Sequence, residues 1–299
     1  MSTKAWTGFA ALSAIWGVPY LFIKVAVDDG VSPLFVAWSR VTLAALVLLG
    51  LAWRAGTLPS LRGRWRWLVV YAVVEITIPF PMIGIGEQRV SSSLAAIIIA
   101  SVPLIVAGLA IRFDQAERAS GRRLVGLLIG LSGVVALVGI DVAGNSRELI
   151  GAGAVLLAAL GYAIGPMVIK LHLGDLDARA TMGASLGLAA LILTPAVLVG
   201  GAGDPPSTKA WLSIAVLGLV CTATAFVLLN RLIVEIGPGR ALVITYINPV
   251  VAVGLGIIFL DERPGPGSVI GLLLIIAGSW ISTDGRLPRA LSRRPARRT

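Results

Sequence analysis

The residues of this sequence that could bind a solute lie inside long apolar segments. Ser13, Trp16, Tyr20 and Lys24 are spaced by three or four residues, so they share one face of a helix. An aromatic and polar stripe on an otherwise apolar helix should turn away from lipid. Trp16 lies deep in its segment, where anchoring at the membrane surface does not explain it. Such aromatic rings are suited to stack on an apolar or aromatic solute.

Glu75 lies about halfway along another apolar segment. An ionised carboxylate at such a position costs roughly 2.5 to 3.5 kcal/mol unless it is paired or protonated. Three interpretations stay open: Glu75 carries a coupling proton, contacts the ammonium group of a solute, or forms a structural pair with Arg40 of the preceding segment. Lys24 and Lys170 lie near the ends of their segments, where a lysine can reach the lipid headgroups or contact a solute.

Prolines interrupt several of the apolar segments. Pro103 and Pro249 lie in the middle of theirs, where each removes a helical hydrogen bond and kinks the helix. Carbonyl groups freed by a kink need partners inside a membrane, so kinked helices tend to line a cavity or another helix. Pro19 and Pro79 mark two further breaks.

Polar side chains accompany these kinks unequally in the two halves of the chain. The second-half kink carries Thr245, Tyr246 and Asn248, whereas the first-half kink offers only Ser101. We therefore expect an asymmetric binding site near the midplane of the membrane. The candidate substrate-binding residues are Trp16, Tyr20, Tyr71, Glu75, Ser101, Tyr162, Tyr246 and Asn248.

The composition places these segments in lipid. With 57% hydrophobic and 13% charged residues, the 299-residue chain is too apolar for a soluble domain, in which about a quarter of the residues are charged. A bilayer core needs about 20 apolar residues per helix, and its backbone groups find partners only within such helices. The sequence therefore predicts an all-α membrane protein with ten transmembrane helices. The ten apolar runs cover residues 5–27, 34–53, 67–85, 92–111, 124–140, 150–169, 180–199, 211–229, 241–260 and 267–283.

Positive charge is distributed unequally between alternate loops. If the N-terminus is cytoplasmic, nearly all loop lysines and arginines are cytoplasmic, and the opposite loops hold only Arg89, Arg147, Lys209 and Arg263. We therefore expect a multi-pass protein of the cytoplasmic (inner) membrane with both termini in the cytoplasm. This bias explains the net charge of +10 without nucleic-acid binding, and the basic tail could contact membrane lipid.

The second half of the chain repeats the first. A shift of 146 residues places Lys24 on Lys170 and Pro103 on Pro249. Each half holds five predicted helices, an odd number, so the second half must cross the membrane in the opposite sense. Such inverted repeats support alternating access by a secondary transporter, with a solute site between the halves.

Several stretches resemble the EamA-type domains of the drug/metabolite transporter superfamily. They are IWGVPYLFIK (15–24), AWSRVTLAALVLL (37–49), SLAAIIIASVPLIVAGLAIRFDQAER (93–118) and YINPVVAVGLGIIFLDERPGPGSVIGLLLIIAG (246–278). The resemblance implies a ten-helix carrier with a central cavity that moves small metabolites such as amino acids, often outward. Within the superfamily, we favour a likeness to the YddG group of aromatic amino-acid exporters. The chain departs from repeat symmetry where Leu186 is the counterpart of Arg40 and Cys221 that of Glu75.

No motif indicates covalent chemistry. The run GASLG (183–187) fits G-x-S-x-G, but Ser185 lies in an apolar helix without the strand-to-helix turn of a hydrolase. The sequence has no phosphate-binding glycine loop, no HExxH pair and no cysteine and histidine cluster, so we expect neither a metal nor another cofactor. An intramembrane enzyme would need clustered acidic or histidine residues at a membrane face, so we expect no enzymatic activity.

Together these patterns predict a secondary transporter that moves a small metabolite, an aromatic or apolar amino acid, outward by alternating access. The alternatives are a multidrug or other metabolite exporter of the same fold, and a non-transporting membrane scaffold. We place one repeat at 1–145, the second at 146–284 and the basic tail at 285–299. The glycines of GLLIG (126–130) suit close helix packing within a monomer or in a weak homodimer.

Overall fold

The computed structural model describes residues 3–102, 104–105, 109, 122–142, 144–229 and 248–282. The chain is almost entirely helical within these ranges. Within the described residues, seven helical segments are long and apolar enough to cross a membrane, and shorter apolar helices accompany them. The prediction of an all-helical membrane protein is thereby confirmed. The predicted segments 92–111 and 241–260 extend beyond the residues described.

The helices follow one another with short connections. In chain order they are α1 (Thr3–Gly17), α2 (Pro19–Asp28), α3 (Pro33–Arg54), η1 (Leu58–Leu61), α4 (Trp65–Tyr71), η2 (Ala72–Thr77), α5 (Pro79–Glu87), α6 (Ser92–Ile99), α8 (Arg122–Leu137), η4 (Val138–Val142), α9 (Ser146–Val168), η5 (Ile169–Leu173), α10 (Ala178–Gly200), α11 (Thr208–Ala215), η6 (Val216–Thr224), α14 (Asn248–Leu260) and α15 (Pro266–Ser282). η1 is a 3-10 turn, whereas η2, η4, η5 and η6 are π-helical turns that continue a neighbouring helix.

Prolines divide two of the spanning segments where the sequence predicted breaks. α1 ends at Gly17 and α2 begins at Pro19, so the first span has a break between them. Pro79 begins α5 directly after the turn η2 and Ile78. Proline is tolerated at these positions because the first residues of a helix have no helical partner for their N–H groups. Pro249 is buried near the start of α14, and Pro103 lies outside the described residues.

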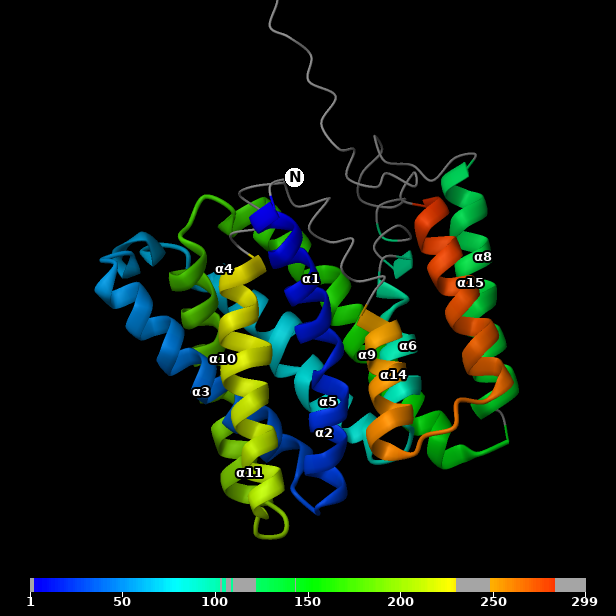
Figure 1. Cartoon of the computed structure of the whole chain (residues 1–299). Helices are drawn as coiled ribbons and strands as arrows, with labels where there is room; N and C mark the ends of the chain where they lie inside the picture. Colours follow the sequence, from blue (N-terminus) through cyan, green and yellow to red (C-terminus); the bar gives the residue numbers. More distant parts are fainter. Residues whose placement is uncertain are drawn as a thin grey trace, which may run out of the picture.

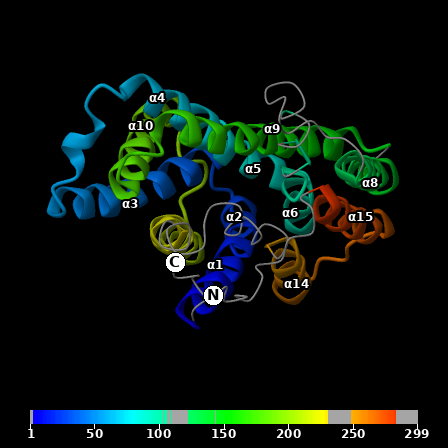
Figure 2. The same ribbon diagram turned by 90° about the horizontal axis from the view of Figure 1, so that it is seen from above.

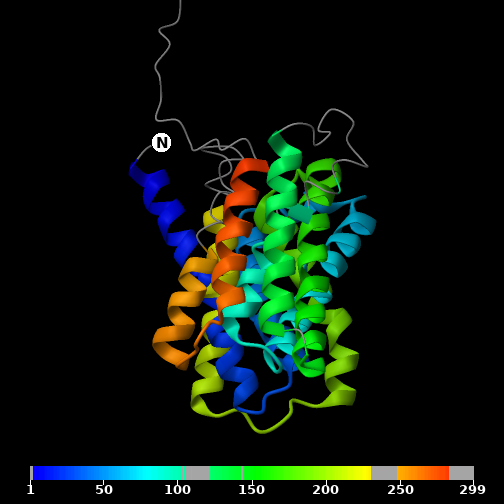
Figure 3. The same ribbon diagram turned by 90° about the vertical axis from the view of Figure 1, so that its right-hand side faces the viewer.

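The helices stand roughly side by side, and α1 tilts away from the others at the N-terminal end (Figures 1 and 3). α3 and α10 pack together at one side of the molecule, and α8 and α15 form a closely packed pair at the other (Figures 1 and 2). α5 and α9 pack together between these pairs. Two hydrophobic clusters run through the bundle, and Tyr162 of α9 packs against both.

One end of the bundle, which we call the arginine-poor end, joins residues 28–33 to residues 201–207. Val31 forms an isolated β-bridge with Gly203, and the Ser32 N–H donates to the Ala202 carbonyl at 2.8 Å. The Ser207 N–H donates to the Asp29 carboxylate at 2.9 Å. This hydrogen bond holds the pKa of Asp29 below its usual range. The two connections are thus tied together although they belong to different halves of the chain.

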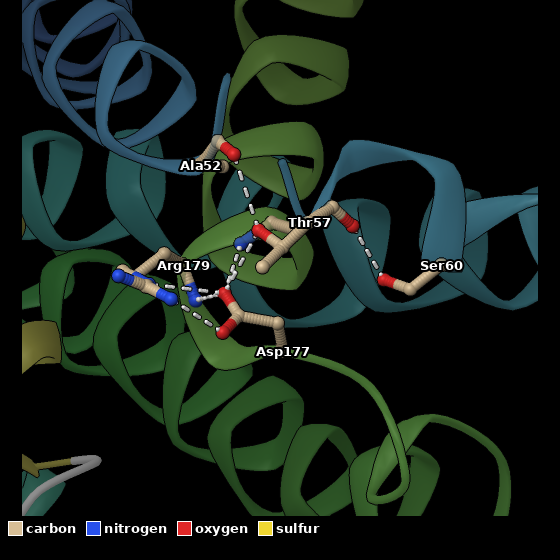
Figure 4. A network of polar contacts seen from close by, with 6 residues as sticks. Ala52, Thr57, Ser60, Asp177 and Arg179 are labelled. Atoms are coloured by element: carbon tan, nitrogen blue, oxygen red, sulfur yellow. Dashed lines mark hydrogen bonds and ion pairs between the residues drawn. The ribbon is translucent and has the colours of Figure 1, made fainter. Parts of the chain in front are cut away.

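The opposite, arginine-rich end joins residues 54–65 to residues 172–179. The Arg64 guanidinium donates to the His172 carbonyl and to the Asp175 carboxylate, each at 2.7 Å. Thr57 donates to Asp177, whose carboxylate also caps α10 and pairs with Arg179 (Figure 4). The hydrogen bond from Arg179 holds the pKa of Asp177 below its usual range.

The connections at the two ends of the bundle can be matched to one another through the repeat. The shift of 146 residues equates the connection 28–33 with residues 174–179, which lie at the opposite end of the bundle. It also equates 54–65 at the arginine-rich end with 200–211, part of which is tied to 28–33 at the arginine-poor end. Equivalent connections of the two halves therefore lie at opposite ends.

The small residues of α8 pack within the chain, against α15. Beta carbons placed at Gly133 or Gly278 would overlap backbone atoms of the facing helix, at Gly271 and at Gly130 respectively. The two helices can approach this closely only because both carry glycine at the contact. The small-residue face of GLLIG is therefore occupied by an intramolecular neighbour.

We predict that Gly278→Ala lowers the stability of the protein by about 1–3 kcal/mol, because the added methyl group would overlap the α8 backbone. Gly254→Ala on α14 is the matched control, since no atom lies within 4 Å of the added carbon. Thermal unfolding of both variants in detergent micelles, followed by tryptophan fluorescence, measures the difference. Equal melting temperatures for the two variants would contradict this packing.

Candidate substrate-binding site

Arg40 of α3 is buried in the bundle and is held by two partners. Its Nε atom donates to the Thr222 hydroxyl of η6 at 2.7 Å, and its guanidinium lies 4.2 Å from the ring centre of Phe80 on α5. The Thr222 hydroxyl in turn donates a hydrogen bond to the Leu217 carbonyl at 2.8 Å. Among the described residues, no aspartate or glutamate forms an ion pair with Arg40. The guanidinium therefore enters the apolar interior with a neutral acceptor and an aromatic ring in place of a carboxylate.

Aromatic side chains from both halves of the chain lie near this guanidinium. The Phe80 ring meets the Tyr162 ring edge to face, with centres 6.5 Å apart. The phenol groups of Tyr20 on α2 and Tyr162 on α9 lie within electrostatic reach of Arg40. Trp16 lies farther along the same side of the first span and meets Phe226 edge to face at 6.3 Å. The arrangement offers one cation framed by stacking surfaces, which suits a solute with an anionic group and an apolar body.

Glu75 lies in the π-helical turn η2 and packs against α9 at Gly165. A beta carbon at Gly165 would overlap the Glu75 carboxyl group, so only glycine leaves room for it there. The Oε2 atom of Glu75 is buried and has no hydrogen-bond partner in the described structure. Glu75 and Arg40 form no ion pair, so the structural pairing that the sequence left open is not seen. The reason is geometric: Arg40 turns toward α5 and η6, whereas Glu75 turns toward α9.

The two π-helical turns η2 and η6 occupy equivalent places in the two halves. The shift of 146 residues carries Ala72–Thr77 onto residues 218–223, which lie within Val216–Thr224. A π-turn displaces the side chains that follow it and recurs at functional positions in helices. Glu75 belongs to the first turn, and Thr222, the partner of Arg40, belongs to the second. Both turns thus contribute polar groups to the membrane interior.

Other residues predicted for the site are occupied by local contacts or lie elsewhere. Tyr71 is buried, and its hydroxyl donates to the Met182 sulfur at 3.6 Å. Ser101 is buried and donates to the Ile98 carbonyl of its own helix at 2.6 Å, so its proton is already used. Asn248 begins α14 with its carbonyl close to Gly17 of the first span.

For three of the predicted residues, the structure does not describe the side chain. Tyr246 and Pro103 lie outside the described residues. Lys170 is in η5, but its side chain is not described. The roles predicted for these residues stay predictions.

The first-span stripe predicted from the sequence is turned inward. Ser13 and Tyr20 are buried and Trp16 is half-buried. Lys24 does not reach into solvent as a free headgroup anchor: its ammonium donates to the Glu87 carbonyl at 2.8 Å and pairs with Asp28 at 3.0 Å. The lysine therefore ties the first span to the end of α5.

The sequence did not identify Glu87, or the partners of Arg40, as candidate site residues. Glu87 ends α5 two residues beyond the predicted segment and is fully buried. A signal was present in Gly84 and Gly86, which precede it: beta carbons there would overlap Pro33 and Val155, so α5 is closely covered at this end. Thr222 and Phe80 carried no comparable signal, because their role depends on which helices meet.

We predict that Glu75→Gln leaves the melting temperature unchanged or raises it, because the buried Oε2 has no partner to lose. Thr222→Val should destabilise by about 1–3 kcal/mol, because it removes the acceptor of the buried Arg40 Nε. Thermal unfolding of the purified variants compares them. A larger loss in Glu75→Gln than in Thr222→Val would show that Glu75 has a structural partner after all. Loss of transport in a folded Glu75→Gln protein would mark Glu75 as functional.

Comparison with known proteins identifies the family. Residues 4–139 and 149–283 each match the EamA-like transporter family, so the domain occurs twice in the chain. YedA, an uncharacterized inner membrane transporter of Escherichia coli (strain K12), is 30% identical over 256 residues, which are 82% of this chain and 79% of YedA. A Streptantibioticus cattleyicolor protein named "Probable terminal-alkyne amino-acid exporter" is 28% identical over 285 residues, 92% of this chain and 91% of that protein.

A solved crystal structure supports the fold. It superposes with a TM-score of 0.67 over 94% of this chain and 98% of its own, at 20% sequence identity. The resemblance to the EamA-type domains is confirmed by the family match, whereas the likeness to the YddG group stays a prediction. The chain is a membrane protein that belongs to the EamA-like transporter family of the drug/metabolite transporter superfamily.

Proposed function

We propose that the protein is a secondary transporter for amino acids with apolar or aromatic side chains, which it moves outward across the cytoplasmic membrane by alternating access. In this proposal the chain forms ten transmembrane helices in two inverted halves, 1–145 and 146–284, with the tail 285–299 in the cytoplasm. The placement of equivalent connections at opposite ends of the bundle supports the inversion. The charge bias supports a cytoplasmic arginine-rich end and an extracytoplasmic arginine-poor end.

The observation that carries the proposal is the buried guanidinium of Arg40, which has no carboxylate partner among the described residues. A charged residue inside the membrane is costly and marks solute or ion pathways. Its planar fork fits a carboxylate with two parallel hydrogen bonds, so the missing partner is best supplied by the solute. Thr222 satisfies only the Nε donor, which leaves the terminal nitrogens available to a solute carboxylate.

The walls of the site favour an apolar or aromatic body on that solute. Tyr20, Phe80 and Tyr162 lie around Arg40, and Trp16 and Phe226 extend the aromatic surface along the first and eighth spans. Aromatic surfaces bury a planar or aliphatic side chain well, while one charge fixes its orientation. The exporter named for an amino acid in Streptantibioticus cattleyicolor supports the same solute class.

Glu75 is the natural contact for the ammonium group, because its buried carboxyl oxygen has no partner in the described structure. Tyr162 lies within electrostatic reach of both Arg40 and Glu75. A multidrug or other metabolite exporter of the same fold is the alternative function. Its solutes would use the aromatic surface without needing Arg40. A non-transporting scaffold would move no solute at all.

Exchange of radiolabelled phenylalanine in proteoliposomes tests the function. We expect wild-type protein to exchange phenylalanine, with unlabelled phenylalanine competing and phenylalaninamide, which lacks the carboxylate, failing to compete. Arg40→Lys should weaken apparent affinity about tenfold or more, since a charged hydrogen bond contributes about 1.5–3 kcal/mol. Arg54→Lys, at the exposed end of α3, is the matched control and should exchange normally.

Three results would count against the proposal. Equal competition by phenylalaninamide would show that the carboxylate is not recognised. Flux of a cationic dye such as ethidium without flux of phenylalanine would favour the multidrug alternative. No flux of either compound, or of tryptophan and leucine, would favour the scaffold.

A further inference from the structure

Glu87, at the arginine-poor end of α5, is a buried acid to which the proposed solute site assigns no role. The residue has no exposed surface, and neither oxygen of its carboxyl group has a hydrogen-bond partner in the described structure. Glycine at positions 84 and 86 lets neighbouring residues close tightly over this end of the helix. A carboxyl group enclosed in this way is stable only as the neutral acid, because an ionised carboxylate needs a paired charge or hydrogen bonds.

The charged groups near Glu87 are engaged with other partners. From α2, Lys24 pairs with Asp28 and donates to the backbone carbonyl of Glu87, not to its carboxyl oxygens. The Glu262 carboxylate, from the connection after α14, accepts the backbone N–H groups of Ser92 and Ser93 at 2.7 and 3.0 Å.

Further neighbours of Glu87 lie on α3, α2 and α9. Arg40 of α3 lies within electrostatic reach of Glu87 and is held by Thr222. The Tyr20 phenol of α2 is also within reach. From α9, Gly151 and Val155 face Gly86, and the Arg147 guanidinium donates to the Gln88 backbone carbonyl at 3.5 Å. No group in this set neutralises an ionised Glu87 in the described arrangement.

A polar surface hollow lies next to this acid at the arginine-poor end. This hollow, of about 400 Å³, is lined by Val27, Asp28, Gln88, Arg89 and Arg147. Gln88, the residue after Glu87, is exposed in it. A small opening between α2 and α5 would therefore connect the Glu87 carboxyl group to the aqueous phase.

We propose that Glu87 is the binding site of a proton that controls the extracytoplasmic gate. When this end opens, Glu87 meets water and releases its proton to the extracytoplasmic side, and the carboxylate pairs with Lys24. When the end closes, a carboxylate oxygen takes a proton from the same side and Lys24 returns to Asp28. Because the closed end holds the neutral acid, external acid favours closure and external alkali favours opening.

This inference rests on the proposed carrier, which must open at the arginine-poor end, but its test needs no solute. Dicyclohexylcarbodiimide modifies neutral carboxyl groups in apolar surroundings and leaves ionised ones largely intact. We expect mass spectrometry of the treated full-length protein to find the adduct on Glu87, decreasing as the pH is raised. Glu148, partly exposed in the first turn of α9 and hydrogen-bonded to Asn145, is the matched control and should stay unmodified. Absence of the adduct on Glu87 at every pH would overturn the proposal.

A second measurement follows the gate itself. Val31 is fully buried in the contact with Gly203. We therefore use Val31→Cys as a reporter, in a Cys221→Ser background that removes the native cysteine. The new cysteine should react with an external, membrane-impermeant maleimide only when this end opens. We expect the labelling rate to rise severalfold with rising external pH. Adding Glu87→Gln, which mimics the neutral acid, should make labelling slow and independent of pH. The same pH dependence with and without Glu87→Gln would overturn the proposal, whereas failure of phenylalanine exchange alone would count only against the proposed solute.

Discussion

The buried guanidinium of Arg40 imposes a constraint on which much of this bundle depends. Lipid supplies no hydrogen-bond partners, so each polar group that enters it must find partners within the protein. Arg40 finds them on two other spans, in the Thr222 hydroxyl and the face of Phe80. α3, α5 and η6 must meet at this point, and they join the two halves of the chain. In the function that we propose, this buried cation also selects the solute.

The helices depart from regular geometry where these polar groups enter. The π-turns η2 and η6 lie at equivalent places in the two halves, although only the first is followed by prolines. Proline alone therefore does not explain both turns. What they share is a polar side chain turned into the bundle, Glu75 in one and Thr222 in the other. The two halves therefore share an irregular backbone at this place but carry different polar side chains there.

The ends of the bundle are held by another kind of contact. At the arginine-poor end, carboxylates of connecting segments accept backbone N–H groups of the other half, as Asp29 does from Ser207 and Glu262 from Ser92 and Ser93. At the arginine-rich end, Arg64 and Thr57 reach the segment after α9. These contacts are polar and lie near water, so they can exchange partners at low cost. The apolar contacts of α8 with α15 cannot exchange partners in this way, because the glycine backbones of the two helices meet directly.

The sequence by itself determined the membrane class, the repeat, the family and the breaks at Pro19 and Pro79. Each of these follows from composition, spacing or the chemistry of one residue, and needs no knowledge of neighbours. Only the tertiary structure decided that Arg40 turns to Thr222 and Phe80, that Glu75 packs against Gly165, and that Glu87 is buried. The roles of Tyr246 and Lys170 stay predictions. Partners across helices depend on which faces meet and at what depth, and apolar segments of similar composition leave those two quantities undetermined until the helices pack.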